Sequence, residues 1–261
     1  MPINYAFSVQ DLEFFLLIFV RVTCFIYIAP FFGMPNTPSR IKVGLGIFIS
    51  ILIYQFIVPH QILDYSTVLG FAVLVLKEAI AGLLIGFGAN ICNTIILFSG
   101  KIMDMEIGLS MVSLFDPVTK EQVGFTGVLY EYSVLLLLIV TDMHQFILRA
   151  FIDSYQLIPT AGIILKSDHL MESMVQFMTD YCVIGFRICL PVFATILLLN
   201  SILGILAKVA PQMNMFSVGM QLKILVGLTI LFLTVRLLPG ISDFIFTEMK
   251  KMMVSFIGGL Y

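Results

Sequence analysis

The sequence predicts an all-α membrane protein, and three observations support this fold class: its composition, its long apolar runs and the lack of strand-like alternation within them. Of the 261 residues, 60% are hydrophobic and 11% are charged, with a mean hydropathy of +1.07. A soluble domain carries about 25% charged residues, because its core needs a polar shell. Here lipid or other apolar protein must replace that shell. The runs also lack the alternation of apolar and polar residues that a transmembrane β-barrel requires.

Six apolar runs are candidates for helices that cross the hydrocarbon core, which takes about 20 residues. They cover residues 12–32, 43–58, 68–98, 124–140, 181–209 and 220–239. Polar or proline-containing connectors lie between them at 33–42, 59–67, 99–124, 141–180 and 211–219, and the tail 241–261 again has helical apolar spacing. The 141–180 connector is expected to contain an amphipathic helix whose apolar face holds Phe146, Ile147, Ala150, Phe151 and Ser154.

Four charged residues lie inside the apolar runs, namely Arg21, Lys77, Glu78 and Arg187. A lipid-facing Arg, Lys or Asp at mid-membrane costs about 2.5–3.5 kcal/mol, so such side chains are expected to face partner helices or water. Lysine and arginine are equally numerous in the connectors on the two sides, so the positive-inside rule sets no orientation. One explanation is that not every apolar run is a true span in the assembled protein.

Small residues and turn residues mark two further features. Gly82 and Gly86 form a GxxxG motif, which lets helix backbones approach closely, either within the chain or against another subunit. The connector 211–219 predicts a hairpin turn between the helices 181–209 and 220–239. In this turn Gln212 and Asn214 are expected to satisfy loose backbone groups, and the turn residues are Pro211, Gln212, Asn214, Phe216 and Gly219.

The segment GLSMVSLFDP (108–117) has two interpretations. It is either a re-entrant or interfacial loop, or a seal whose Met and Phe side chains adapt their shape to close a wide pore. Pro117 biases Asp116 towards extended backbone, so this dipeptide would end the segment.

The chemistry of the chain points away from an enzyme. The sequence contains no HExxH, GxSxG, Walker A or GxGxxG motif, and no basic patch typical of nucleic-acid binding. His60, His144 and His169 lie in separate connectors without metal-ligand spacing, so no metal or cofactor is expected.

The alternative function is a secondary transporter of small solutes with Lys77, Glu78 and Arg187 along an ion pathway, although no inverted repeat supports it.

A family resemblance covers nearly the whole chain. The stretches RVTCFIYIAPFFGMPNTPSRIKVGLG, GLSMVSLFDP, MHQFILRAFIDSYQLIPTAG and LLLNSILGILAKVAPQMNMFSVGMQLKILVGL occur in this order. Together they resemble the FliR family of flagellar type III export-apparatus proteins. The related injectisome family is similar, but the DP and APQ-x-N-x-F-x-x-G signatures look more flagellar.

The resemblance implies a subunit of a hetero-oligomeric, helical export gate in the bacterial inner membrane, inside the flagellar basal body. The implied partners are FliP and FliQ, which complete the channel, FlhB and FlhA, and the unfolded flagellar subunits that pass through it. Within one FliR-like domain, residues 1–180 resemble FliP and residues 181–261 a FliQ-type helical hairpin. A loop of the family plugs the closed channel, and it maps onto 108–117, which makes Met111, Leu114 and Phe115 the implied plug residues. Long, broken helical hairpins are the implied fold.

Overall fold

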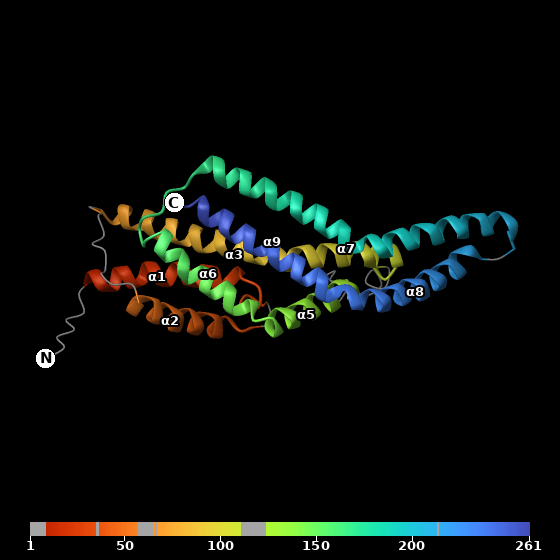
Figure 1. Cartoon of the computed structure of the whole chain (residues 1–261), viewed down its shortest axis with the longest axis horizontal. Coiled ribbons are helices and arrows are strands. Elements are labelled where there is room, and N and C mark those ends of the chain that lie inside the picture. The colour runs from red at the N-terminus through yellow and green to blue at the C-terminus, as the bar shows by residue number, and fades with distance from the viewer. Residues whose placement is uncertain (1–8, 35–36, 57–64, 66, 111–123, 213) are drawn as a thin grey trace. The chain divides into compact units, whose positions relative to one another are not determined.

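All regular secondary structure in the described part of the chain is helical (Figure 1). The computed structural model describes residues 9–34, 37–56, 65, 67–110, 124–212 and 214–261. The helices are α1 (Val9–Ile28), α2 (Ser39–Phe56), α3 (Val68–Ile107), α5 (Phe125–Val140), α6 (Met143–Leu157), α7 (Ser167–Val209), α8 (Met215–Thr234), the 3₁₀ helix η1 (Val235–Leu237) and α9 (Leu238–Gly258). The all-α class predicted from composition is therefore confirmed over these residues.

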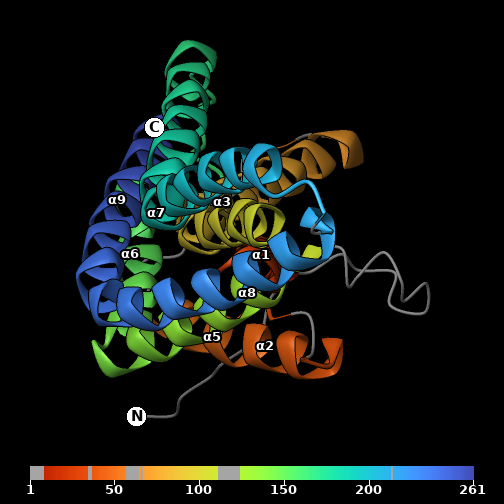
Figure 2. The ribbon, with the colours of Figure 1, turned by 90° about the vertical axis from the view of Figure 1, so that its right-hand side faces the viewer.

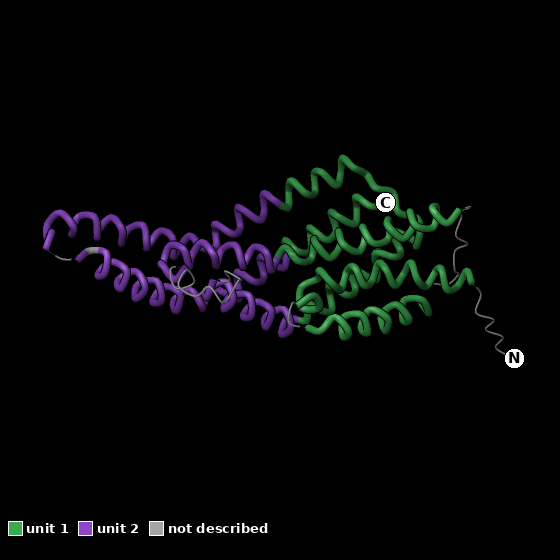
Figure 3. Tube along the Cα trace, turned by 180° about the vertical axis from the view of Figure 1, so that it is seen from behind, with its two compact units in different colours: residues 1–91, 142–177, 248–261 green, residues 92–141, 178–247 purple. Residues whose placement is uncertain are grey.

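The chain divides into two compact units, which are coloured separately in Figure 3. Unit 1 consists of Met1–Ile91, Asp142–Phe177 and Glu248–Tyr261, and unit 2 consists of Cys92–Thr141 and Met178–Thr247. Helices α3, α7 and α9 each contribute residues to both units. Each unit therefore draws on segments that are far apart in the sequence.

In unit 1, α1 and α2 lie side by side, as Figures 1 and 2 show, and α6 covers part of α1. The Phe25 ring of α1 stacks on the Phe151 ring of α6 with centroids 4.1 Å apart. Ile147, Phe151 and Ser154 of α6 are buried, which confirms these members of the predicted apolar face. Helical spacing of apolar residues therefore places this face correctly.

The last residues of the chain belong to unit 1 and pair with the segment before α7. The Ile164 N–H donates to the Leu260 carbonyl at 3.1 Å, and the Lys166 N–H donates to the Gly259 carbonyl at 3.0 Å. These bonds satisfy backbone groups that lie outside any helix. They fix the chain end beside the start of α7.

In unit 2, the last turns of α7 and the helix α8 form an antiparallel hairpin, visible in Figures 1 and 2. Helix α5 is joined to the end of α8 by a hydrogen bond of 2.9 Å between the hydroxyls of Tyr130 and Thr234. The Phe98 ring of α3 lies 4.6 Å from the Tyr181 ring of α7. Aromatic and polar contacts thus connect the helices of this unit.

Two helices extend well beyond the apolar runs that predicted them. The run 68–98 becomes a helix that continues to Ile107, so Asp104 and Glu106 are helical and not part of a connector. Similarly, α7 begins at Ser167, fourteen residues before the expected start at 181. Hydropathy marks where apolar residues end, whereas helical hydrogen bonding continues through charged residues that are acceptable helix formers.

The number of membrane-crossing helices also differs from the sequence-based expectation. Among the described residues, four helical stretches are long and apolar enough to cross a membrane, or five if α5 and α6 count as one. They are Ser39–Phe56, Val68–Ile107, Ser167–Val209 and Phe216–Gly258. By length and composition, the described helices therefore provide four or five spans where the sequence offered six candidates. The run 12–32 corresponds to α1, which contains Asp11, Glu13 and Arg21 and is not one of the four.

The two longest helices exceed the thickness of a bilayer. Helix α3 has 40 residues and α7 has 43. At 1.5 Å per residue each is about 60 Å long, which is twice the hydrocarbon thickness of about 30 Å. A large part of each helix must therefore lie outside the hydrocarbon at ordinary tilt angles.

Candidate functional site

Arg21 and Glu78 form a buried ion pair in unit 1. Arg21 Nε donates to Glu78 Oε2 at 2.5 Å, and neither side chain is exposed to solvent. The guanidinium also lies over the Tyr155 ring, 4.3 Å from its centroid, where cation–π attraction adds to the ion pair. These two charges are thus neutralised inside the chain itself, and neither reaches a surface where another subunit or a pore would meet it.

The ion pair and Lys77 together bond the backbone of the turn 158–163, which joins α6 to α7. The hydrogen bonds run from Arg21 Nη1 to the Ile158 carbonyl (3.0 Å), from the Ala161 N–H to Glu78 Oε1 (2.8 Å) and from Lys77 Nζ to the Ile163 carbonyl (3.3 Å). Ala161 has a φ of 68°, in the left-handed region that an alanine adopts only when its surroundings hold it there. The three charged side chains, called the charge cluster below, therefore fix the shape of this turn.

Two glycines of α3 allow the ion pair to form. A Cβ at Gly82 would collide with the Arg21 carbonyl oxygen, and a Cβ at Gly86 would lie 3.0 Å from the Phe25 carbonyl oxygen. Glu78 is one helical turn before Gly82, so one stripe of α3 runs parallel to the Arg21–Phe25 face of α1. The GxxxG motif thus serves close packing within the chain, one of the two alternatives that the sequence left open.

In unit 2, Asp104 joins the end of α3 to the start of α5. Its carboxylate accepts hydrogen bonds from the Thr126 N–H at 3.1 Å and from the Thr126 hydroxyl, and it is 2% exposed. An acidic side chain beside the free N–H groups of a helix start is stabilised by hydrogen bonding and by the helix dipole. The end of α3 and the start of α5 therefore lie next to each other.

Glycines again permit this contact. A Cβ at Gly124 would collide with the Asp104 carboxylate, and a Cβ at Gly100 would collide with the backbone of Gly127. At these positions α3 and α5 approach backbone to backbone. The end of α3 and the start of α5 are therefore tightly packed against each other.

Replacing Asp104 with alanine is expected to lower the free energy of unfolding by about 1–3 kcal/mol, because the Thr126 donors would remain buried without an acceptor. Hydrogen exchange of the detergent-purified chain should show faster exchange in peptides covering the start of α5. Asp243→Ala, at an exposed position on α9, is the matched control. Equal protection of α5 in the wild type and in Asp104→Ala would contradict this role of Asp104.

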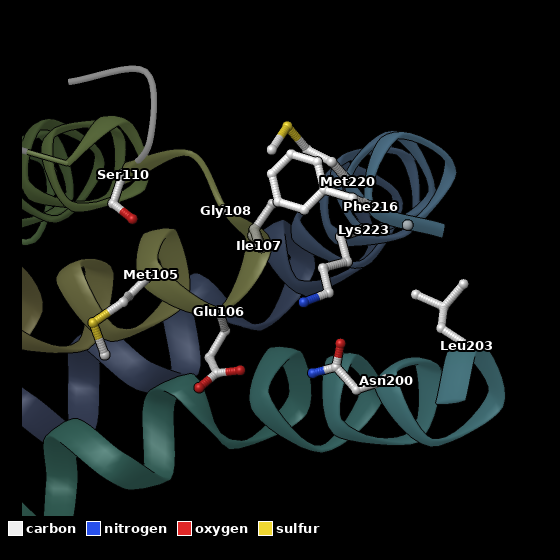
Figure 4. Close-up of a pocket in the computed structure, with 11 residues that line it drawn as sticks. Met105, Glu106, Ile107, Gly108, Ser110, Asn200, Leu203, Phe216, Met220 and Lys223 are labelled. Atoms are coloured by element: carbon white, nitrogen blue, oxygen red, sulfur yellow. The ribbon is translucent and has the colours of Figure 1, made fainter. Parts of the chain in front are cut away.

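The implied plug residues Met111, Leu114 and Phe115 lie outside the described residues. Of the described first residues of their segment, Gly108 and Ser110 line a cavity of about 430 Å³ in unit 2, shown in Figure 4. In this view Lys223 and Asn200 point towards each other across the cavity. Among the described residues, the lining consists of Met105, Glu106, Ile107, Gly108, Ser110, Asn200, Leu203, Phe216, Gly219, Met220 and Lys223. The structure thus brings the start of the predicted seal next to residues of the predicted hairpin turn.

The break between α7 and α8 is shorter than the expected turn 211–219. Pro211, Gln212 and Asn214 lie in the break, whereas Phe216 and Gly219 lie in the first turns of α8. Asn214 precedes the helix, and its side chain makes no capping hydrogen bond to α8. Its backbone carbonyl accepts the bond from the Val218 N–H instead.

The remaining predicted charge, Arg187, is on an exposed face of α7 and lies over the Phe244 ring.

Sequence reasoning missed the turn 158–163 and the contact between Asp104 and Thr126. The turn takes part through backbone carbonyl and N–H groups, which every residue type carries, so composition gives no signal. A signal for the second contact was available. The acceptor Asp104 lies near the start of the connector 99–124, and the donor Thr126 lies just after its end. Among the described residues, no group of His, Cys, Asp or Glu is arranged to hold a metal ion.

Comparison with known proteins identifies the family. The family described as bacterial export proteins, family 1, matches residues 12–249. The chain belongs to this family. Its relatives include the flagellar biosynthetic protein FliR of Bacillus subtilis, which is 28% identical over 83% of this chain and 84% of its own length.

Two further relatives match over almost their whole length. The FliR of Escherichia coli is 24% identical over 92% of this chain and 91% of its own length, and that of Aquifex aeolicus is 26% identical over 93% of both chains. This bacterial export protein is therefore a component of the flagellar biosynthesis and export apparatus. Its apolar helices make it a multi-pass membrane protein.

Proposed function

We propose that this chain is a subunit of the flagellar type III export gate and forms, with FliP and FliQ, the channel that passes unfolded flagellar subunits across the bacterial inner membrane. FlhB and FlhA are proposed as further partners at the basal body. The FliR relatives, which match this chain along most of its length, carry the proposal. The proposed role is passive: the chain contributes a wall and a seal and catalyses no reaction.

The lengths of α3 and α7 support an assembly of this kind. Both helices are about twice as long as the hydrocarbon is thick, and both expose apolar side chains, among them Leu76 and Leu83 of α3 and Leu198 of α7. An isolated chain would leave some of these side chains in water. Other apolar subunits around the chain would cover them, as in an oligomer whose interfaces resemble a protein core.

The division into a FliP-like part, 1–180, and a FliQ-like hairpin, 181–261, remains part of the proposal. It describes likeness to partner proteins and not compactness, since each compact unit contains residues from both parts. The hairpin of α7 and α8 in unit 2 is compatible with it.

The segment 108–117 is proposed to plug the closed channel, with Met111, Leu114 and Phe115 as the sealing side chains. The buried contact between Asp104 and Thr126 supports this role, because a plug needs a fixed base. Replacing all three sealing residues with serine is expected to let small ions leak through the resting gate. Membrane conductance of cells or proteoliposomes that carry the assembled gate measures this leak. A conductance equal to that of the wild type would exclude a sealing role for these residues.

The export-gate proposal is tested by co-expression with FliP-type and FliQ-type partners, followed by native mass spectrometry of the complex in detergent. A single large hetero-oligomer that contains this chain is the expected result. A stable complex of this chain alone would refute the proposal.

The transporter alternative gains no support from the structure, because Glu78 is enclosed in an ion pair and Lys77 is bound to a backbone carbonyl.

A further inference from the structure

One face of α7 in unit 2 carries a regular row of exposed residues that we call the α7 seam. Its members are spaced alternately by four and three residues, the spacing by which one helix packs along another. The seam consists of Val183, Arg187, Leu190, Ala194, Leu197 and Ser201, all of which are exposed. It extends over about 27 Å, close to the thickness of the hydrocarbon core.

Arg187 is the one charged member of the seam, and no described residue of the chain neutralises it. Its guanidinium lies 5.4 Å from the centroid of the Phe244 ring. Within the described residues it has no ion pair or hydrogen bond. This environment contrasts with that of Arg21, whose carboxylate partner is supplied by the same chain. A guanidinium has five N–H donors, and in apolar surroundings their satisfaction requires an acceptor from elsewhere.

The other seam residues favour a protein helix over lipid as the occupant. Ala194 and Ser201 are small, and small residues at membrane interfaces let a second backbone come close. The Ser201 hydroxyl is already bonded to the Leu197 carbonyl at 3.1 Å, so it does not need a polar neighbour. Large apolar side chains alternate with these small ones, as Val183, Leu190 and Leu197 are 60%, 58% and 49% exposed. Lipid would require neither the small residues nor the cation.

We propose that the α7 seam is an interface for an apolar helix of a partner subunit that carries one carboxylate, and that this carboxylate pairs with Arg187. A bidentate Arg–carboxylate pair would satisfy four hydrogen-bonding atoms and remove two charges from an apolar interface at once. It would also fix the register of the two helices along the seam, because only one position of the partner places its carboxylate at Arg187. The inference rests on the proposed membership of an oligomeric gate and specifies one contact within it.

The test uses the full-length chain co-expressed with its proposed partner subunits. Arg187→Glu is expected to weaken assembly at least about tenfold, because it sets two carboxylates against each other, whereas Arg187→Lys should retain most of it. Lys208→Glu makes the same change of charge at an exposed position in the last turn of α7 and should leave assembly unchanged. The thermal stability of the purified single chain should be the same in all these variants, which separates loss of the interface from misfolding.

Two further measurements identify the occupant. A photo-crosslinking residue at Ala194 should react with a partner helix, and replacing the carboxylate found there with arginine should restore assembly of Arg187→Glu. Crosslinks to lipid alone, or full assembly of Arg187→Glu, would overturn the inference while leaving the export-gate proposal intact. Failure of the wild-type chain to join any complex would instead refute the export-gate proposal itself.

Discussion

Replacing Glu78 with alanine is expected to lower the free energy of unfolding by about 3–5 kcal/mol, the largest effect of any single substitution considered for this chain. The change leaves the Arg21 guanidinium fully buried without a counter-charge. It also removes the acceptor of the Ala161 N–H, which holds the left-handed turn between α6 and α7. Chemical denaturation of the chain in detergent micelles, followed by circular dichroism, measures the loss.

An ion pair with one exposed partner provides the control. Lys251 of α9 pairs with Glu248, and the Lys251 side chain is 58% exposed whereas that of Glu248 is 11% exposed. Glu248→Gln leaves only the exposed Lys251 unpaired, where water solvates it, so this change is expected to cost less than about 1 kcal/mol. The double variant Arg21→Met, Glu78→Leu should recover part of the stability lost in Glu78→Ala, because no unpaired charge remains in the core. The recovery should stay incomplete, since the Ala161 N–H and the Ile158 carbonyl would still lack their side-chain partners. If Glu78→Ala unfolds at the same denaturant concentration as the wild type, the charge cluster does not stabilise unit 1.

Replacing Gly82 with alanine is expected to destabilise the chain by about 2 kcal/mol, although alanine is the better helix former. The added methyl group would collide with the Arg21 carbonyl oxygen, which belongs to a helical backbone and cannot turn away as a flexible side chain would. Separation of α1 from α3 would in turn strain the ion pair between Arg21 and Glu78. The same denaturation experiment measures this effect.

Gly44→Ala is the matched control, because Gly44 is also inside a helix of unit 1 but has nothing within 4 Å of an added Cβ. This variant should be more stable than the wild type by about 0.5–1 kcal/mol through helix propensity alone. Both substitutions add one methyl group to a helical glycine. Their effects on the free energy of unfolding should nevertheless have opposite signs. A stabilising Gly82→Ala would show that α1 and α3 do not pack as closely as described.

Both predictions concern contacts that sequence patterns suggested only in part. The GxxxG spacing indicated that Gly82 and Gly86 allow a close approach, but not which helix approaches. The apolar context of Arg21 and Glu78 indicated that each needs a partner, but not that they are each other's partner. They are separated by 57 positions in the sequence, and no local rule connects residues so far apart.

The sequence by itself determined the features that depend on local chemistry. The high apolar content required a membrane protein, and the lack of strand-like alternation selected helices, which satisfy every backbone group within their own segment. Periodicity located the buried face of α6, and motifs in series indicated the family. Each of these properties is set by residues within one or two turns of each other, or by total composition.

Tertiary structure alone decided which segments meet. It enclosed Arg21 and Glu78 within the chain while leaving Arg187 exposed, although all three lie in apolar runs and look alike in sequence. It also extended α3 and α7 beyond their apolar runs and connected Asp104 to Thr126. The physical reason is that burial of a charge depends on whether another part of the chain supplies an acceptor at the right distance, and that is a property of the folded arrangement rather than of the residue and its neighbours.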